Sequence, residues 1–281
     1  EQMTNLSKRL RQWLRESYAD RHLELNDRRV SVDGTEKFLF RLSDSAAIET
    51  VLIPEPERNT LCMSSQVGCK YSCAFCVSGR GGFVRNMTTA EIVDQLYLVN
   101  GMVEADKRVT NVVFMGVGEP LDNYDNLMAA IEVIGDEKGI YLGRRKISIS
   151  TCGIIPAIER LLREDRGIRL SVSLHAADNE TRSKIMPVNR RYPLEQLIPL
   201  LDRYGRRYSR SVFYEYILIK GVNASVEDAR KLVRLLKGTQ AKVNLIPYNP
   251  SPYFDWQPPT QADIQAFRDV LEQSGLFYTV R

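Results

Sequence analysis

Short runs of β-branched and apolar residues alternate with longer stretches of helical periodicity from about residue 60 to the end of the chain. The runs predict strands at 60–65, 112–115, 146–150, 169–174, 212–218, 242–246 and 277–280. Helices are expected between them, at about 88–104, 123–137, 155–165, 193–209, 225–238 and 260–274. Repeated βα units indicate a parallel sheet with helices packed on it. About six units exceed a small open sheet and fall short of a closed eight-stranded barrel, so the pattern predicts an α/β fold with a partial (β/α)6 barrel of the TIM type.

The first fifty residues have a different pattern. Apolar positions recur at helical spacing within residues 1–20, and three β-like runs follow at 29–32, 37–42 and 49–53. Asp33-Gly34 between the first two runs indicates a hairpin turn. We therefore expect a small N-terminal accessory element of a helix plus a β-hairpin at 1–54, and a core at 55–281. The first residue is Glu, so we expect the natural chain to begin earlier.

Composition narrows the class of protein. The 281 residues are 43% apolar, which supports a sizeable core. No run approaches the roughly 18 unbroken apolar residues of a membrane span, and the N-terminus lacks a secretory signal pattern. The five Cys are an odd number with three crowded together, which fits reduced thiols better than a secreted disulfide framework. We expect a soluble, cytoplasmic protein with no membrane partner.

The formal net charge is only +4, but the basic residues are unevenly placed. One group lies in the first thirty residues, and the others include Tyr or lie near Tyr. Such groups can follow a phosphate backbone, but runs of this kind are more often the solvated face of a helix, balanced by Asp and Glu. The later groups are Arg144-Arg145-Lys146, Arg190-Arg191, and Arg203, Arg206, Arg207 and Arg210.

Three closely spaced thiols are the most informative chemical feature. Cys69, Cys73 and Cys76 follow the first core strand in one loop. A [4Fe–4S] cluster takes four ligands, usually Cys thiolates, so three ligands would leave one iron for a small molecule. A zinc knuckle or buried structural Cys is the alternative, although no second C-x-x-C or His pair completes a zinc tetrahedron.

Polar residues gather where several predicted strands end. Met115-Gly-Val-Gly-Glu-Pro120 follows the second core strand and can bring Glu119 close to a cationic group. The next strands end in Ser148-Ile-Ser-Thr-Cys-Gly153 and Ser171-Val-Ser-Leu-His-Ala176. In barrels of this kind the carboxyl ends of the strands carry the active site, so we expect these residues to share one site. We expect His175 to have a binding role.

These motifs occur together in one family. The chain resembles the radical S-adenosylmethionine (SAM) enzymes, and within them the RlmN/Cfr group of RNA adenosine methyltransferases. The resemblance spans nearly the whole chain. It is carried by Glu49-Thr-Val-Leu-Ile-Pro54, Leu61-Cys-Met-Ser-Ser-Gln-Val-Gly68, the Cys69-x3-Cys73-x2-Cys76 triplet, Gly81-Gly-Phe-Val-Arg-Asn86, Met115-Gly-Val-Gly-Glu-Pro120, Ser173-Leu-His-Ala176 and Asn244-Leu-Ile-Pro-Tyr-Asn-Pro250.

The resemblance implies a role for each matching residue. The three Cys would hold a [4Fe–4S] cluster whose free iron binds SAM. Glu49 would be a proton acceptor, and Cys62 would act near the target base. The residues implied to contact SAM are Gly118, Glu119, Ser150, Ser173, Leu174, His175 and Asn249. Implied partners are 23S ribosomal RNA, with transfer RNA as a further candidate, and an electron donor such as flavodoxin or ferredoxin. We expect the protein to act as a monomer.

The resemblance also implies radical chemistry. C2 and C8 of adenine are electron-poor and do not attack a sulfonium, whereas a carbon radical can add to them. In this family SAM first methylates a Cys on a C-terminal segment. The sequence given holds no Cys after Cys152, so we expect residues 1–281 alone to cleave SAM without methylating RNA. We interpret Cys152 as structural.

The sequence leaves several hypotheses about the reaction and the substrate. Gly81-Gly-Phe-Val-Arg-Asn86 is closer to the C2-directed branch than to the C8-directed one. A radical SAM enzyme with another substrate and a non-catalytic, metal-containing RNA-binding module are the remaining alternatives.

Overall fold

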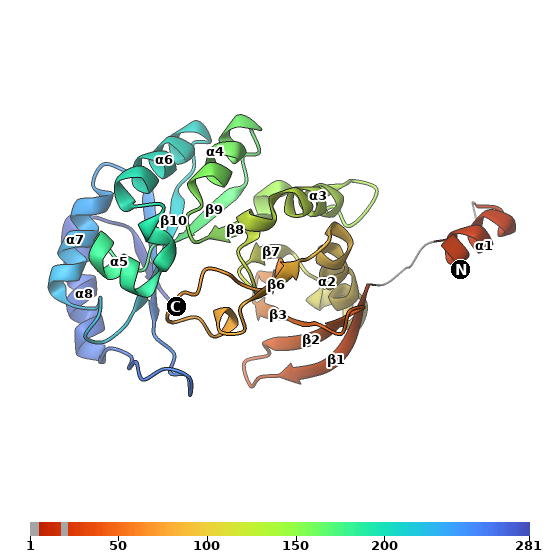
Figure 1. Ribbon diagram of the computed structural model, residues 1–281, viewed down its shortest axis with the longest axis horizontal. Helices are drawn as coiled ribbons and strands as arrows, with labels where there is room; N and C mark the ends of the chain where they lie inside the picture. The colour runs from red at the N-terminus through yellow and green to blue at the C-terminus, as the bar shows by residue number, and fades with distance from the viewer. Residues whose placement is uncertain (1–5, 18–21) are drawn as a thin grey trace.

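A single mixed sheet of ten strands runs through the protein. The computed structural model describes residues 6–17 and 22–281 (Figure 1). Neighbouring strands follow the order β1-β2-β3-β4-β7-β8-β9-β10-β11-β12. Their bounds are β1 Leu23–Val30, β2 Glu36–Leu42, β3 Ala47–Glu55, β4 Arg58–Cys62, β7 Asn111–Phe114, β8 Ile147–Thr151, β9 Arg169–Ser173, β10 Val212–Leu218, β11 Ala241–Pro247 and β12 Tyr278–Val280. A separate two-stranded sheet pairs β5 (Gln66–Gly68) with β6 (Phe83–Asn86).

In the order β4-β7-β8-β9-β10-β11-β12, each strand is parallel to the next. A helix follows each of them except β12, which gives six βα units and a last strand. The two edge strands, β1 and β12, do not pair with each other, so the barrel stays open. The partial (β/α)6 barrel expected from the sequence is therefore confirmed. The helices are α1 Lys8–Ser17, α2 Thr89–Met102, α3 Tyr124–Gly135, α4 Ile155–Arg163, α5 Asn179–Ile185, α6 Leu194–Arg207, α7 Val226–Leu236 and α8 Gln261–Ser274.

The N-terminal strands extend the same sheet. β1 and β2 form the antiparallel hairpin predicted at Asp33-Gly34, and Gly34 takes the left-handed conformation that the turn requires, with φ of +83°. β3 then joins β2 antiparallel on one side and β4 antiparallel on the other. The boundary expected at 54/55 falls at the end of β3 and stays a prediction. Part of the helix expected within 1–20 lies outside the described residues.

Strand alternation gives the barrel an apolar outside and a polar inside. The positions that face the helices are apolar and buried, because they form the main core. Examples are Val112, Phe114, Ile147, Ile149, Leu170, Val172, Tyr214 and Tyr216. The intervening positions on β8 and β9 are mainly serines, Ser148, Ser150, Ser171 and Ser173, and they line cavities inside the barrel. Polar groups therefore surround a space that can hold a ligand.

Helix starts follow the cap chemistry in the sequence. At α2, Thr88 accepts a hydrogen bond from the Glu91 amide, and the Glu91 carboxylate accepts one from the Thr88 amide, which is the predicted capping box. Figure 1 shows α4, α6, α7 and α8 on the outside of one half of the molecule. In the described part of the chain no helix is long and apolar enough to cross a membrane.

Candidate active site

The three-cysteine loop leaves β5 through a position that only glycine can occupy. Gly68 has φ of +72°, and a Cβ there would lie 1.9 Å from the carbonyl oxygen of Gly82. The Cys69 amide donates to the same oxygen at 2.9 Å. The Ala74 amide donates to the Ile185 carbonyl at 2.8 Å, which ties the loop to α5. The loop is drawn in orange near the centre of Figure 1.

The thiols of Cys69, Cys73 and Cys76 line one cavity of about 330 Å³. Burial raises the pKa of Cys73 to about 12, with the neighbouring thiols adding to the effect, and burial also raises the pKa of Cys69. Metal ligation requires thiolates, so a cationic centre would stabilise the deprotonated form that burial disfavours. In the described chain no three His, Cys, Asp or Glu side chains are gathered around a single ion position. A cubane places each thiolate on a different iron, so three soft donors on one loop fit a [4Fe–4S] cluster.

Glu119 is buried and lines the same cavity. One carboxylate oxygen accepts from the Leu121 amide at 3.0 Å and the other from the Cys152 amide at 2.7 Å. Burial raises the pKa of Glu119, against the lowering effect of these bonds. Each oxygen keeps a further lone pair, so the carboxylate can still receive an ammonium group. A bound cation would favour its ionised form.

Gly118 positions Glu119 by close backbone packing. With φ of +101°, Gly118 lies against Gln66, and a Cβ would come within 2.5 Å of the Gln66 Cβ. The Gln66 amide oxygen accepts from the Glu119 backbone N–H at 2.8 Å. The loop after β7 and the start of β5 therefore hold Glu119 in place together.

His175 lies at the carboxyl end of β9 as a neutral donor. Its Nδ1 accepts a hydrogen bond from the Ile217 amide at 3.0 Å, which places the ring proton on Nε2. Burial, with Arg182 nearby, lowers the pKa of His175 to about 3. The ring meets Phe75 of the cysteine loop edge-on, with 4.7 Å between the centroids. Because it lines the same cavity, its Nε2–H can donate to a ligand but cannot act as a base near neutral pH.

The cavity thus combines a thiol loop, a buried carboxylate, a neutral imidazole and the hydroxyls of Ser150 and Ser173. Residues 63–236 match the radical SAM superfamily. The chain is 44% identical over its whole length to the dual-specificity RNA methyltransferase RlmN of Parvibaculum lavamentivorans, of which it covers 74%. It is also 44% identical over its whole length to the enzyme of that name from Desulfotalea psychrophila, of which it covers 80%. The chain belongs to the RlmN family of radical SAM RNA methyltransferases.

A solved structure supports the same family. The radical SAM methyltransferase from Sphaerobacter thermophilus superposes with a TM-score of 0.96 at 42% identity, over 99% of this chain and 82% of that one. SuiB from Streptococcus suis, solved with S-adenosylmethionine, has a TM-score of 0.55 at 17% identity and shares the fold. The RlmN family implies a [4Fe–4S] cluster and SAM as cofactors, in agreement with the sequence analysis.

Two of the residues expected to contact SAM do not line the cavity. Asn249 follows β11 on the surface and is exposed. The side chain of Leu174 is fully buried away from solvent, and its carbonyl accepts from Arg182 at 3.0 Å. A contact from Leu174 to a ligand would therefore involve its backbone. The SAM-binding roles of both residues stay predictions.

Glu49 and Cys62 lie outside this cavity. The Glu49 carboxylate is on β3, about half exposed, and pairs with Lys37 at 3.3 Å. Cys62 ends β4 and lines an adjoining cavity of about 220 Å³, which shares Met115 and Glu215 with the first. Burial raises the pKa of Cys62 to about 11, so its thiol is protonated at neutral pH. The role of Glu49 as a proton acceptor and that of Cys62 near the target base stay predictions.

The structure adds two residues that the sequence analysis missed. Glu215 on β10 is buried inside the barrel and accepts from Ser171 and Asn244, each at 3.0 Å. The sequence offered one signal for Glu215, because it is the only charged residue in the otherwise apolar run of β10. Arg182 on α5 is fully buried and donates to the carbonyls that end β8 and β9. Nothing in its local sequence distinguishes it from a surface arginine.

Proposed function

We propose that this protein methylates C2 of adenosine in 23S ribosomal RNA and in transfer RNA by radical SAM chemistry. The observation that carries the proposal is the single cavity shared by Cys69, Cys73, Cys76, Glu119 and His175 at the carboxyl ends of the parallel strands. Family membership supports the same reaction, because the relatives are dual-specificity RNA methyltransferases.

Each wall of the cavity has a part in holding the cofactors. The three Cys would hold the cluster, which supplies the electron that breaks a carbon–sulfur bond of SAM. Gly118 lets the backbone approach closely, and Glu119 would receive the SAM ammonium group. His175 offers an N–H donor. The hydroxyls of Ser150 and Ser173 offer both donors and acceptors, and Leu174 and Asn249 complete the predicted contacts.

The choice of a radical route follows from the target carbon. C2 of adenine is bonded to two ring nitrogens and is electron-poor, so it is not a nucleophile toward a sulfonium. The base must also leave its stack to reach a pocket inside a barrel. Cys62 lies in the cavity next to the cluster site, which supports its proposed place near the base. The lysine-paired Glu49 is proposed as a proton acceptor from the family resemblance alone.

The test uses the natural full-length protein, reconstituted with iron and sulfide without oxygen and supplied with SAM, a reductant and RNA transcripts. Nucleoside mass spectrometry should find 2-methyladenosine, and a Cys73→Ser variant should lose both the iron and the product. Methylation at C8 instead would assign the protein to the C8-directed branch. SAM consumption without any methylated adenosine would refute the proposal. A colourless protein with one zinc would favour a metal-containing RNA-binding module.

Partners of the reaction are proposed on the same basis. An electron donor such as flavodoxin or ferredoxin would reduce the cluster at the mouth of the barrel. A cytoplasmic location suits the thiols, since all five Cys are free and cluster ligands must stay reduced. The monomeric state stays a prediction, and size-exclusion chromatography with light scattering tests it.

A further inference from the structure

A second concave surface lies far from the candidate active site. It is a groove of about 1010 Å³ that four chain segments line. Six cationic side chains and one carboxylate, Asp165, face it. We call it the basic groove. Its cations are Arg144, Arg145, Lys146, Arg166, Arg207 and Arg210.

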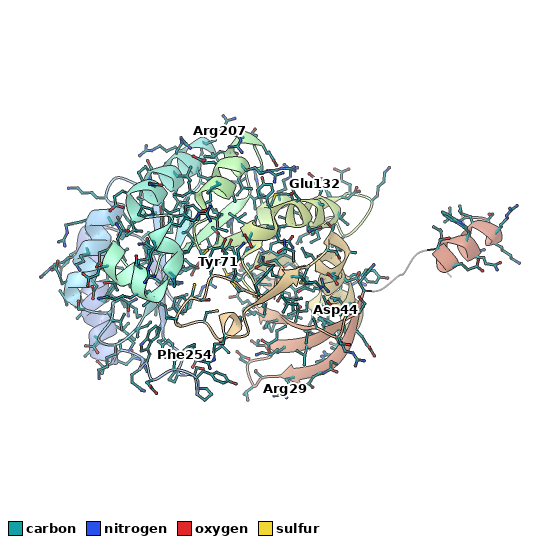
Figure 2. All side chains as sticks on the ribbon, in the orientation of Figure 1. Arg29, Asp44, Tyr71, Glu132, Arg207 and Phe254 are labelled. Atoms are coloured by element: carbon teal, nitrogen blue, oxygen red, sulfur yellow. The ribbon has the colours of Figure 1, made fainter. Side chains whose placement is uncertain are left out.

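The fold brings these segments together at the amino ends of the strands. Residues 144–146 precede β8, 165–167 precede β9, and 207–210 precede β10. The cysteine loop and Glu119 lie at the carboxyl ends of the same sheet. A five-residue strand such as β9 is about 17 Å long, so the basic groove and the active site are separated by about that distance. In Figure 2, Arg207 lies at the edge of the molecule, and Tyr71 of the cysteine loop lies near its centre.

Most of the positive charge in the basic groove is not neutralised by the protein. Arg166 pairs with Glu132 and Glu164, and Arg207 pairs with Asp165 at 3.3 Å. Arg210 donates to the Gly167 carbonyl at 2.8 Å. Arg144, Arg145 and Lys146 are exposed and have no carboxylate within ion-pair distance among the described residues. Adjacent cations repel one another, so a polyanion would gain from all of them at once.

Aromatic side chains accompany the cations. Tyr141 is 63% exposed at the rim and precedes Arg144 by three residues. Tyr208 is held in the wall, where a Cβ on Gly167 would lie 3.3 Å from its ring and Tyr204 lies 4.9 Å away, centroid to centroid. The exposed ring of Tyr141 among these cations suits stacking with a base next to bound phosphates.

We propose that the basic groove binds the phosphate backbone of the RNA substrate at a distance from the target base. The inference rests on the proposed function, which supplies the RNA. A folded RNA that presents one adenosine at the barrel mouth has phosphates well beyond 17 Å from it, and the groove gives them a docking site. An acidic electron donor is the competing occupant, but it must approach the cluster, which lies at the other end of the strands.

The test compares two double variants of the reconstituted full-length protein. Arg144→Gln/Arg145→Gln removes two unpaired charges from the basic groove. Arg230→Gln/Arg234→Gln on α7 is the control, because it changes the net charge equally and both residues already pair with Glu227. Affinity for a 23S ribosomal RNA transcript is measured at several salt concentrations.

The groove variant should bind RNA about tenfold more weakly at low salt. The slope of log affinity against log salt concentration should be smaller in magnitude by about 1.4 to 1.8, because two phosphate contacts are lost and each removes about 0.7 to 0.9 from the slope. The control should match the unaltered protein in both measurements. Tyr141→Ala should weaken binding without changing the salt dependence. SAM cleavage without RNA should be the same in every variant.

Three results would overturn the proposal. Equal losses of RNA affinity in the groove variant and the control would show that RNA binding depends only on net charge. Unchanged RNA affinity with slower reduction by flavodoxin or ferredoxin would assign the groove to an electron donor. Unchanged affinity and unchanged reduction would leave the groove with no docking role. Failure of the proposed function gives a different pattern, namely normal groove-dependent RNA binding without methylated adenosine.

Discussion

Removal of the buried guanidinium of Arg182 should destabilise the ends of two strands that carry the site. Arg182 is fully buried and makes four hydrogen bonds. They reach the carbonyls of Leu174 at 3.0 Å, Cys152 at 2.8 Å and Ser173 at 3.0 Å, and the amide oxygen of Asn189 at 2.8 Å. One side chain thus links β8, β9 and the 3₁₀ helix after α5.

The magnitude follows from the acceptors that a substitution leaves behind. Arg182→Met fills a similar length of space and removes the buried charge, but it leaves four oxygens without this donor, three of them buried and one partly buried. An unsatisfied buried polar group costs about 1–3 kcal/mol, so four at the lower end give about 4 kcal/mol. Burial lowers the pKa of Arg182 to about 10, which shows that the charge itself is costly to bury and argues against the upper end.

Urea unfolding of the cluster-free protein, followed by circular dichroism, measures this loss. The free energy of unfolding of Arg182→Lys should lie between those of the unaltered protein and Arg182→Met, because a single ammonium nitrogen cannot reach all four acceptors. Arg203→Met, an exposed position on α6, is the control and should change the free energy of unfolding by less than about 0.5 kcal/mol. Hydrogen exchange at Cys152 and Leu174 should also become faster in Arg182→Met. A loss below about 1 kcal/mol, or unchanged exchange there, would refute the reasoning.

Three further predictions concern the cavity. Gly118→Ala should lower the free energy of unfolding by about 1–3 kcal/mol and weaken SAM binding, because φ is +101° and the new Cβ meets Gln66. Equilibrium dialysis measures the SAM binding, and Gly81→Ala, with open space around it, is the matched control. Glu119→Gln should weaken SAM binding about 10- to 100-fold with an unchanged circular dichroism spectrum, since a charge-assisted contact is worth about 1.5–3 kcal/mol. In the unaltered protein, calorimetry should show that SAM affinity falls as the pH is lowered. A raised pKa means that Glu119 is protonated, and loses its charge, at a higher pH than an ordinary glutamate. An affinity that does not change with pH would count against the ammonium contact. His175 has a pKa of about 3 in the folded chain, below its unfolded value, so the unfolded chain alone takes up a proton between about pH 6.5 and 3 and the fold loses stability there. His175→Asn, which suits φ of +57°, should therefore differ less from the unaltered protein at pH 4 than at pH 7 in urea titrations, and a constant difference would contradict the assignment.

Local patterns in the sequence predicted most of the fold. Seven of the eight helices in the described chain lie in predicted ranges, and all seven parallel strands overlap predicted ones, because amphipathic spacing and cap residues act over a few neighbouring positions. The first core strand is β4, Arg58–Cys62, and ends earlier than expected, since residues after Cys62 turn toward β5. Helix α5 was not predicted, because it is short and is stabilised by the buried Arg182.

The site was predicted where chemistry lies within one motif. Cys69, Cys73 and Cys76 are close in sequence, and a short loop keeps them close in space. Glu119 and His175 were found because both lie where a strand ends, and parallel strands bring their carboxyl ends to one edge. The same rule could not tell that Asn249 would point to the surface or that Cys62 would lie in a separate cavity, because strand-end position does not specify side-chain direction.

The sequence by itself determined the alternation of strands and helices, the thiol loop and the resemblance to a family. Only the tertiary structure decided which distant residues meet: Arg182 with the ends of β8 and β9, Glu215 with Asn244, and Arg144 with Arg207 and Arg210 in the basic groove. The physical reason is one of range. Periodicity, capping and turn chemistry depend on neighbours within a few residues, whereas these contacts depend on the strand order and register of the whole sheet.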